Sequence, residues 1–201
     1  MTSTSKNLRA ADVAAVVLAG GRSSRFGSDK AQYVVDGKPM MQHVIDVVRP
    51  FVRNIVVVRG SSTDPKPNRV ATGADAMATD IFADAGPLAG IHAGMLQAGA
   101  EWLLVVSCDL LHITPVLVAE LLGHAVATVD AVIPGAKKMP PQYLCSLYRS
   151  SLLPIVEEQL RGGSYAVRGF VARIPSVYLL PWEGREITSV NTRSDLDASA
   201  E

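Results

Sequence analysis

A run of apolar residues near the start of the chain leads directly into a loop that is rich in glycine and positive charge. The run, residues 13–18, has the composition of a buried strand. The loop that follows, residues 19–33, carries three glycines and three cations in close succession: Gly20, Gly21, Arg22, Arg25, Gly27 and Lys30. Glycine lets backbone N–H groups converge on anionic oxygens, and Arg and Lys add positive charge. The pattern therefore predicts a phosphate-binding loop.

Two better-known phosphate loops do not match this sequence. The P-loop has four residues between its glycines and then Lys-Ser/Thr, whereas here five residues separate Gly21 from Gly27 and Lys30 lies further on. The dinucleotide-binding pattern G-x-G-x-x-G is absent as well. An ordinary strand-to-helix turn with solvated cations is the alternative, but such a turn does not require three cations beside three glycines. We favour the phosphate-binding interpretation.

The balance of charge restricts the partners that such a loop can serve. The chain carries 19 basic and 19 acidic residues, so any anion-binding site must be local, and bulk attraction to nucleic acid or to an anionic membrane is not implied. Aromatic residues make up only 5%, which is too few for a base-stacking surface. No apolar run approaches the roughly 20 residues that span a bilayer, and residues 1–9 are polar. We expect a cytoplasmic protein that binds neither nucleic acid nor membranes.

The length of 201 residues is sufficient for one large domain with its own core. We expect a single domain over residues 1–201, in which residues 1–10 form a loose tail. The two cysteines, Cys108 and Cys145, lie inside apolar runs and are not spaced as a metal-binding pair. We therefore expect them to be reduced thiols in the core rather than zinc ligands.

Apolar runs alternate with segments of helical periodicity along the whole chain. Expected strands are residues 13–18, 54–59, a short one ending near Asp80, 102–107, 131–134, 143–148 and 177–180, with a short extended piece at 188–191. Expected helices are residues 40–48, 86–98, 115–122, 151–160 and 165–173, the third capped by Thr114. Uninterrupted β-branched runs suit parallel strands that are covered on both faces. The alternation predicts an α/β fold, a three-layer α/β/α sandwich with a mostly parallel sheet.

Two further segments are placed to meet a ligand. Asp109 comes just after the buried run 102–107, and ligands of parallel α/β sheets bind outside the carboxyl ends of the strands. A carboxylate there suits Mg²⁺ bound to phosphates, although an Asp that caps the next turn is the alternative. Residues 86–90, Gly-Pro-Leu-Ala-Gly, open a helix. The small residues of this helix, Ala89, Gly90, Ala93 and Gly94, fit either the approach of a ligand near its N-terminus or close packing of the helix on the sheet, and beside the first loop we favour the ligand.

Four segments together resemble a known family. They are residues 18–30 (LAGGRSSRFGSDK), Asp80 with residues 86–90, Ser107-Cys108-Asp109, and residues 189–192 (SVNT) with Asp195-Leu196. Their composition, order and separation resemble those of the nucleotidyltransferases with a Rossmann-like, GT-A-like α/β fold. Within that group the chain most resembles the molybdenum cofactor guanylyltransferase (MobA-like) family, which joins GMP from GTP to molybdopterin. The resemblance spans most of the chain.

The resemblance implies roles for individual residues. The nucleotide-binding residues would be Leu18, Ala19, Gly20, Gly21, Lys30, Asp80, Gly86, Pro87, Leu88, Gly90 and Asp109. Catalysis would depend on Lys30, Arg25, Arg22 and Asp109. Asp109 and Asn191 would hold the metal ion, Mg²⁺ or alternatively Mn²⁺. The substrates would be GTP and molybdopterin, and the family membership suggests transient contacts with other proteins of molybdenum cofactor biosynthesis and a monomer or weak oligomer.

Several positions depart from the family pattern. Phe26 stands where Met is usual, Arg59-Gly60 where an Asn often meets the nucleotide, Leu110-Leu111 where a turn with Pro is common, Met139-Pro140-Pro141 where His-Pro is common, and Ser189 where Asn is usual. These changes leave open a cytidylyltransferase, a sugar- or alcohol-phosphate nucleotidyltransferase, or a non-catalytic nucleotide-binding module. Lys137 and Lys138 could meet an anionic acceptor, but we favour a role in keeping their loop soluble.

Overall fold

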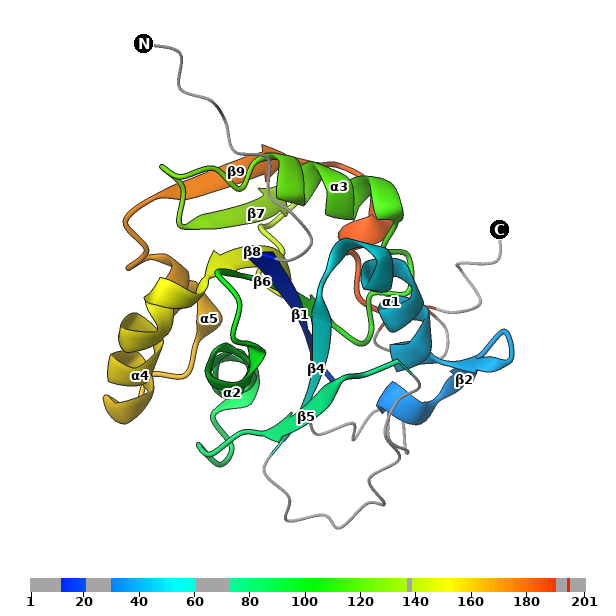
Figure 1. The fold of residues 1–201 in the computed structure, drawn as a ribbon, viewed down its shortest axis with the longest axis horizontal. Coiled ribbons are helices and arrows are strands. Elements are labelled where there is room, and N and C mark those ends of the chain that lie inside the picture. Colours follow the sequence, from blue (N-terminus) through cyan, green and yellow to red (C-terminus); the bar gives the residue numbers. More distant parts are fainter. Residues whose placement is uncertain (1–11, 21–29, 61–72, 137–138, 191–194, 196–201) are drawn as a thin grey trace.

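A seven-stranded sheet forms the middle layer of the molecule (Figure 1). The computed structural model describes residues 12–20, 30–60, 73–136, 139–190 and 195. The strand order is β5-β4-β1-β6-β8-β7-β9. The strands are β1 (Val13–Leu18), β4 (Asn54–Arg59), β5 (Ala76–Thr79), β6 (Trp102–Ser107), β7 (Ala131–Gly135), β8 (Cys145–Arg149) and β9 (Val177–Pro181). All neighbouring pairs are parallel except those of β8, which runs antiparallel to β6 and β7, so the predicted mostly parallel sheet is confirmed.

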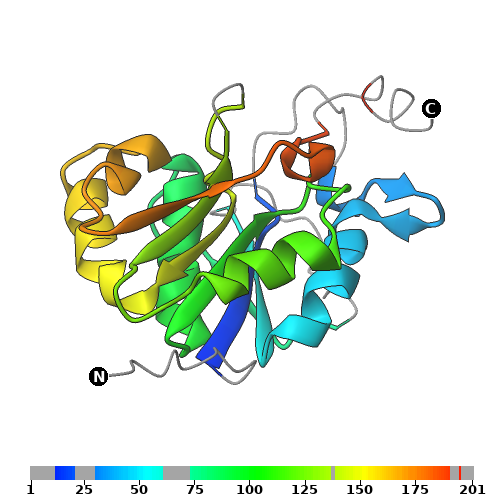
Figure 2. The same ribbon diagram turned by 90° about the horizontal axis from the view of Figure 1, so that it is seen from above.

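Helices cover both faces of this sheet, as the sequence predicted (Figure 2). One face carries α1 (Met40–Val48) and α3 (Pro115–Gly123); the other carries α2 (Gly86–Ala98), α4 (Leu153–Arg161) and α5 (Val167–Val171). The short hairpin of β2 (Val34–Val35) and β3 (Lys38–Pro39) projects beyond α1 (Figure 1). Asp36 and Gly37 form its turn with positive φ values of 46° and 79°, the backbone that a two-residue hairpin of this kind requires.

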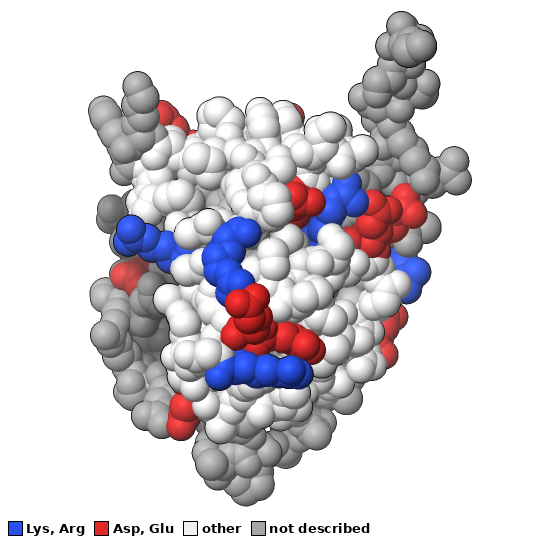
Figure 3. Space-filling view, turned by 90° about the vertical axis from the view of Figure 1, so that its left-hand side faces the viewer, with Lys and Arg blue, Asp and Glu red and all other residues white. Residues whose placement is uncertain are grey.

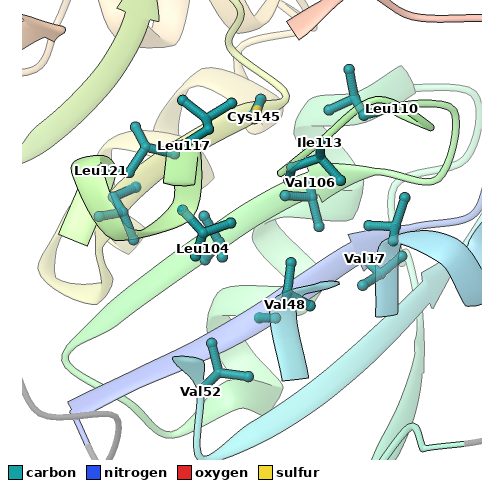
Figure 4. Packing of buried hydrophobic residues seen from close by; sticks show 14 of the residues in the cluster. Val17, Val48, Val52, Leu104, Val106, Leu110, Ile113, Leu117, Leu121 and Cys145 are labelled. Carbon is teal, nitrogen blue, oxygen red and sulfur yellow. The ribbon is translucent and has the colours of Figure 1, made fainter. Parts of the chain in front are cut away.

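Alternate residues of the central strands pack into two separate cores. Val13, Ala15 and Val17 join the cluster beneath α1 and α3, whereas Ala14, Val16 and Leu18 join the cluster beneath α2 and α4. Figure 4 shows the first cluster, to which strands contribute Val17 and Leu104 and α1 contributes Val48. All six residues of β1 are buried, which explains why its sequence is continuously apolar instead of alternating.

α2 lies unusually close to β1 because two of its residues are glycines. A Cβ atom added to Gly94 would lie 2.4 Å from Cγ1 of Val16, and one added to Gly90 would lie 2.8 Å from Cδ2 of Leu18. Such separations are shorter than any relaxed contact between carbon atoms. Close packing of helix and sheet therefore accounts for these glycines, the less favoured of the two alternatives that the sequence raised.

The elements that differ from expectation lie mainly in the second half of the chain. Three elements were predicted with bounds wrong by two or more residues: the strand at 143–148 is β8 at Cys145–Arg149, the helix at 165–173 is α5 at Val167–Val171, and the helix at 151–160 begins as a 3₁₀ turn (η4, Ser150–Leu152) before α4. Pro154 explains the last change, since proline fits only the first turn of an α-helix. The helix at 115–122 and the strands at 131–134 and 177–180 each extend one residue further than predicted. Residues 188–190 form no strand; the Val190 N–H donates instead to the Asp109 carbonyl (3.0 Å).

Both cysteines are described, buried and not joined in a disulfide, as the sequence predicted. Burial raises the pKa of the Cys145 thiol to about 12, so this thiol stays protonated and unreactive at neutral pH.

The charged side chains on the face of α4 alternate in sign (Figure 3). Arg161 pairs with Glu157 (3.5 Å) within this helix, and Arg173, which follows α5, pairs with Glu158 of α4 (2.6 Å). Charges of opposite sign side by side give no extended field of one sign, consistent with an anion site confined to one place. None of the helices in the described ranges has both the length and the apolar character needed to cross a bilayer.

Replacing Gly94 with Ala should destabilise the protein. The added methyl group would overlap the buried Val16 side chain, and overpacking of a filled core costs typically about 1–3 kcal/mol. We expect thermal unfolding to show a Tm lower by about 2–4 °C for each kcal/mol lost. Gly123→Ala is the matched control, because no atom lies within 4 Å of the added Cβ atom at the end of α3. Equal Tm values for the two variants would contradict the close approach of α2 to β1.

Candidate functional site

The carboxyl ends of four parallel strands meet at one edge of the sheet. In the pairing register Leu18 lies beside both Val58 and Ser107, and Arg59 lies beside Thr79. The segments that follow these strands therefore leave the sheet together: residues 19–20 after β1, Gly60 after β4, Asp80 after β5 and residues 108–109 after β6. This is the edge at which parallel α/β sheets bind their ligands.

The backbones at the ends of β1 and β4 lie very close to each other. The Ala19 N–H donates to the Val58 carbonyl (2.8 Å), which continues the pairing beyond the strand. A Cβ atom on Gly20 would lie 2.5 Å from the backbone nitrogen of Gly60, so a side chain cannot occupy this position without moving one strand end. Only glycine is compatible with this arrangement.

Asp80, which follows β5, lies next to Gly60 at the end of β4. Its N–H donates to the Arg59 carbonyl (3.2 Å), and its Oδ2 atom lies 3.8 Å from the place where a Cβ atom of Gly60 would stand. Among the described residues, the Asp80 carboxylate is therefore the nearest group to the place that a side chain at position 60 would take. The sequence had marked position 60 only as a departure from the family pattern; in the structure it lies beside Asp80 at the carboxyl edge of the sheet.

An ion pair joins the first loop to the end of β6. Lys30 begins the 3₁₀ turn η2 (Lys30–Gln32), and its Nζ atom lies 2.7 Å from Oδ2 of Asp109, 79 residues further along the chain. Each of the two side chains is only 15% exposed. The Cys108 N–H donates to the Leu18 carbonyl (3.1 Å), which fixes the turn that presents Asp109 beside β1. The structure thus brings together two of the residues that the sequence singled out for catalysis.

The second oxygen of Asp109 has no hydrogen-bond partner among the described residues, although it is buried. Buried carboxylate oxygens usually have such a partner, so this one is available to a ligand. Carboxylate oxygen is the ligand type that Mg²⁺ prefers, so the residue fits the predicted metal ion. Within the described ranges no three His, Cys, Asp or Glu side chains are grouped to hold a metal. Asp109 would therefore need further oxygen ligands from outside that group, such as phosphates and water.

The remaining site predictions divide into two groups. Gly86 and Pro87 are exposed at the N-terminus of α2, whereas Leu88 and Gly90 are buried, Gly90 against Leu18. Their role in binding a nucleotide stays a prediction. Four predicted site residues lie outside the described residues: Gly21, Arg22, Arg25 and Asn191.

The C-terminal segment that the resemblance had marked, residues 189–192, reaches the site at Val190, and it is held there by Gln142, which the sequence had not singled out. Val190 packs against Met40 in a small separate core, and its N–H bonds the Asp109 carbonyl. Gln142 holds this segment from the other side, because its Nε2 atom donates to the Ile187 carbonyl (2.8 Å). The two partners are 45 residues apart, so no local pattern could have pointed to Gln142.

Comparisons with known proteins agree with the α/β fold and identify the family. The family model described as MobA-like NTP transferase domain matches residues 15–177. A molybdenum cofactor guanylyltransferase from Desulfosudis oleivorans is 33% identical over 159 residues, which cover 78% of this chain and 75% of the relative. A probable molybdenum cofactor guanylyltransferase from Nostoc sp. is 31% identical over 196 residues, covering 92% and 89%.

Two solved structures share the fold. Molybdopterin-guanine dinucleotide biosynthesis protein A from Archaeoglobus fulgidus superposes with a TM-score of 0.73 at 24% identity, covering 93% of this chain and 96% of that protein. The 2-C-methyl-D-erythritol 4-phosphate cytidylyltransferase from Thermus thermophilus gives a TM-score of 0.69 at 18% identity, covering 94% and 96%. At these identities the likeness concerns the fold alone.

Replacing Gln142 with Ala should loosen the segment that ends at Val190. The change removes the donor to the Ile187 carbonyl, and losing a partly buried hydrogen bond costs about 1–3 kcal/mol. We expect the Val190 amide to exchange its hydrogen about tenfold faster for each 1.4 kcal/mol of local stability lost, measured by hydrogen exchange. Amides of β1 should be unaffected. Gln42→Ala, which removes an exposed hydrogen bond to Asp46, is the matched control. Unchanged exchange at Val190 would show that Gln142 does not anchor this segment.

Proposed function

The chain belongs to the MobA-like NTP transferase family, and from this membership we propose that it transfers GMP from GTP to the phosphate of molybdopterin, releasing pyrophosphate. The chain is accordingly a nucleotidyltransferase. The relatives at 33% and 31% identity, both named as guanylyltransferases of the molybdenum cofactor, support this choice of nucleotide and acceptor. The cytidylyltransferase of similar fold is more distant, at 18% identity.

The observation that carries the proposal is the Lys30–Asp109 pair at the carboxyl edge of the sheet. We assign Lys30 to the α-phosphate of the bound nucleotide, where its ammonium group would stabilise the charge that develops during transfer. Asp109, with its available Oδ1 atom, would hold Mg²⁺, and Asn191 is a second candidate ligand. When bound, the metal ion would supply positive charge to the phosphates. Mn²⁺ could replace it, since it accepts the same oxygen ligands.

The transfer itself needs little from the protein beyond positioning. An oxygen of the acceptor phosphate attacks the α-phosphorus in line; a new P–O bond forms as the bond to the β-phosphate oxygen breaks, and pyrophosphate leaves with that oxygen. A phosphate monoester has its second pKa near 6 and is already ionised at neutral pH. No general base is therefore required, and the site residues act by orientation and by neutralising charge.

We place the guanine base beyond the carboxyl ends of β1, β4 and β5, next to Gly60 and Asp80. Guanine presents two neighbouring donors on its Watson–Crick edge, and a carboxylate can accept from both. In this arrangement Asp80 would meet the base from the β5 side, and Leu18, Ala19 and Gly20 would meet it from the β1 side. The exposed start of α2, at Gly86 and Pro87, would cover the base from the other side. Cytosine lacks this pair of donors, so the arrangement favours GTP over CTP.

Thermal unfolding with added nucleotides tests the proposed substrate. GTP with Mg²⁺ should raise the Tm of the protein, because a ligand at 100 times its Kd adds about 2.7 kcal/mol to the free energy of unfolding. CTP, ATP and UTP should give smaller shifts. Asp109→Asn should remove most of the GTP shift, since the metal would lose its carboxylate. A larger shift with CTP would reassign the protein to cytidylyl transfer, and no shift with any nucleotide would contradict the site.

Removing the Lys30 side chain should abolish most of the turnover. Lys30→Ala is expected to lower the rate of pyrophosphate release by about 10² or more, the usual effect of losing one donor that stabilises the transition state. The matched control is Lys38→Ala, which removes an ion pair with Asp46 whose side chains are 56% and 44% exposed. Turnover of Lys30→Ala close to that of Lys38→Ala would overturn the role of Lys30.

A further inference from the structure

The ion pair between Lys30 and Asp109 engages the carboxylate that is proposed to hold the metal ion. The Lys30 ammonium group lies 2.7 Å from Oδ2 of Asp109, in direct contact with the carboxylate. Both side chains are 15% exposed, unlike the Lys38–Asp46 pair on the surface. Water screens a partly buried pair less than an exposed one, so this contact is the stronger of the two.

A divalent cation at Asp109 would have to share the carboxylate with Lys30. Two positive charges on one small anion repel each other, and that repulsion is only weakly screened in a site of low exposure. The oxygen that remains, Oδ1, is buried and accepts no hydrogen bond from the described part of the chain. The carboxylate is therefore half occupied: one oxygen is held by Lys30, and the other is open.

A nucleoside triphosphate changes this balance of charge. Its phosphates bring several negative charges to the loop that ends at Lys30, and an ammonium group binds phosphate oxygens as readily as it binds a carboxylate. Lys30 could then transfer from Asp109 to the phosphates. The vacated Oδ2 and the open Oδ1 would both become available to a cation at the moment when the triphosphate supplies further oxygen ligands.

We propose that Lys30 is an internal counter-ion that keeps divalent metal off Asp109 until a nucleoside triphosphate binds. This inference rests on the proposed function, because it assumes that the site receives a triphosphate. It goes further in assigning the order of events: free metal is excluded, and metal and nucleotide enter together. The role differs from that of a phosphate-binding lysine alone, which would leave the affinity of the nucleotide-free protein for metal unchanged.

The test is a titration of the nucleotide-free protein with Mn²⁺, followed by the EPR signal of the free ion. Lys30→Met keeps an unbranched side chain and removes the charge. We expect it to bind Mn²⁺ at least tenfold more tightly than the parent, and we expect Lys30→Met/Asp109→Asn to lose this gain. Lys38→Met should behave like the parent, because its partner Asp46 lies outside the site. Lys30→Gln serves as a second variant if Lys30→Met does not fold, as judged by circular dichroism.

Equal Mn²⁺ affinity of the parent and of the folded Lys30 variant would overturn the proposal, as would a gain that persists in the double variant. In the parent, adding GTP should then create tight Mn²⁺ binding that was absent before. The failure of the proposed function would look different: the parent would neither bind GTP nor release pyrophosphate with Mg²⁺ and acceptor present. Because the decisive titration contains no nucleotide, its result does not depend on turnover.

Discussion

The close contact of the central strand β1 with its neighbours determines where everything else in the site can lie. α2 reaches β1 only because Gly94 and Gly90 have no side chains, and the β4 end reaches the β1 end only because Gly20 has none. β1 is thereby held from one face and from its edge, while its other face is filled by the core under α1 and α3. Because β1 is packed on all these sides, the residues that follow it, Ala19 and Gly20, have a fixed position. The phosphate-binding function predicted for the loop that they begin depends on this rigidity, because positioned donors act without reorganisation.

The elements that the sequence predicted to the residue are those with a local cause. β1, β4, β6 and α2 are continuous apolar runs or helices opened by Gly-Pro, and their bounds agree with the structure. The bounds of β8 differ because they depend on a partner distant in the chain, since β8 pairs antiparallel with β6 across about forty residues. The start of α5 is set by a side-chain contact with another helix, because Gln159 on α4 donates to the Ala166 carbonyl just before α5. Periodicity carries no information about such contacts.

The site shows the same division. Lys30 and Asp109 were each suggested by their neighbours in the sequence, a cationic loop and the end of a buried strand, but their direct contact was not, since 79 residues separate them. The family resemblance suggested roles for Lys30 and Asp109. Their closeness depends on the pairing of β1 with β6, which places the segments after these two strands side by side. Val190 lies in the segment 189–192 that the resemblance had marked, but Gln142 had no signal, because it acts through a side-chain hydrogen bond to the remote Ile187 carbonyl. The single-domain organisation, the oligomeric state and the contacts with other biosynthetic proteins stay predictions.

A protein of balanced charge that binds a highly charged nucleotide must solve an electrostatic problem locally. Before the nucleotide arrives, a carboxylate in a site of low exposure is costly unless a cation accompanies it. Lys30 meets that need from within the chain, so the empty site requires neither free metal nor an altered fold. The same lysine is the group that the phosphates attract when they arrive. In our proposal this one side chain balances the Asp109 carboxylate in the absence of substrate and leaves that carboxylate to the metal ion once the nucleotide binds.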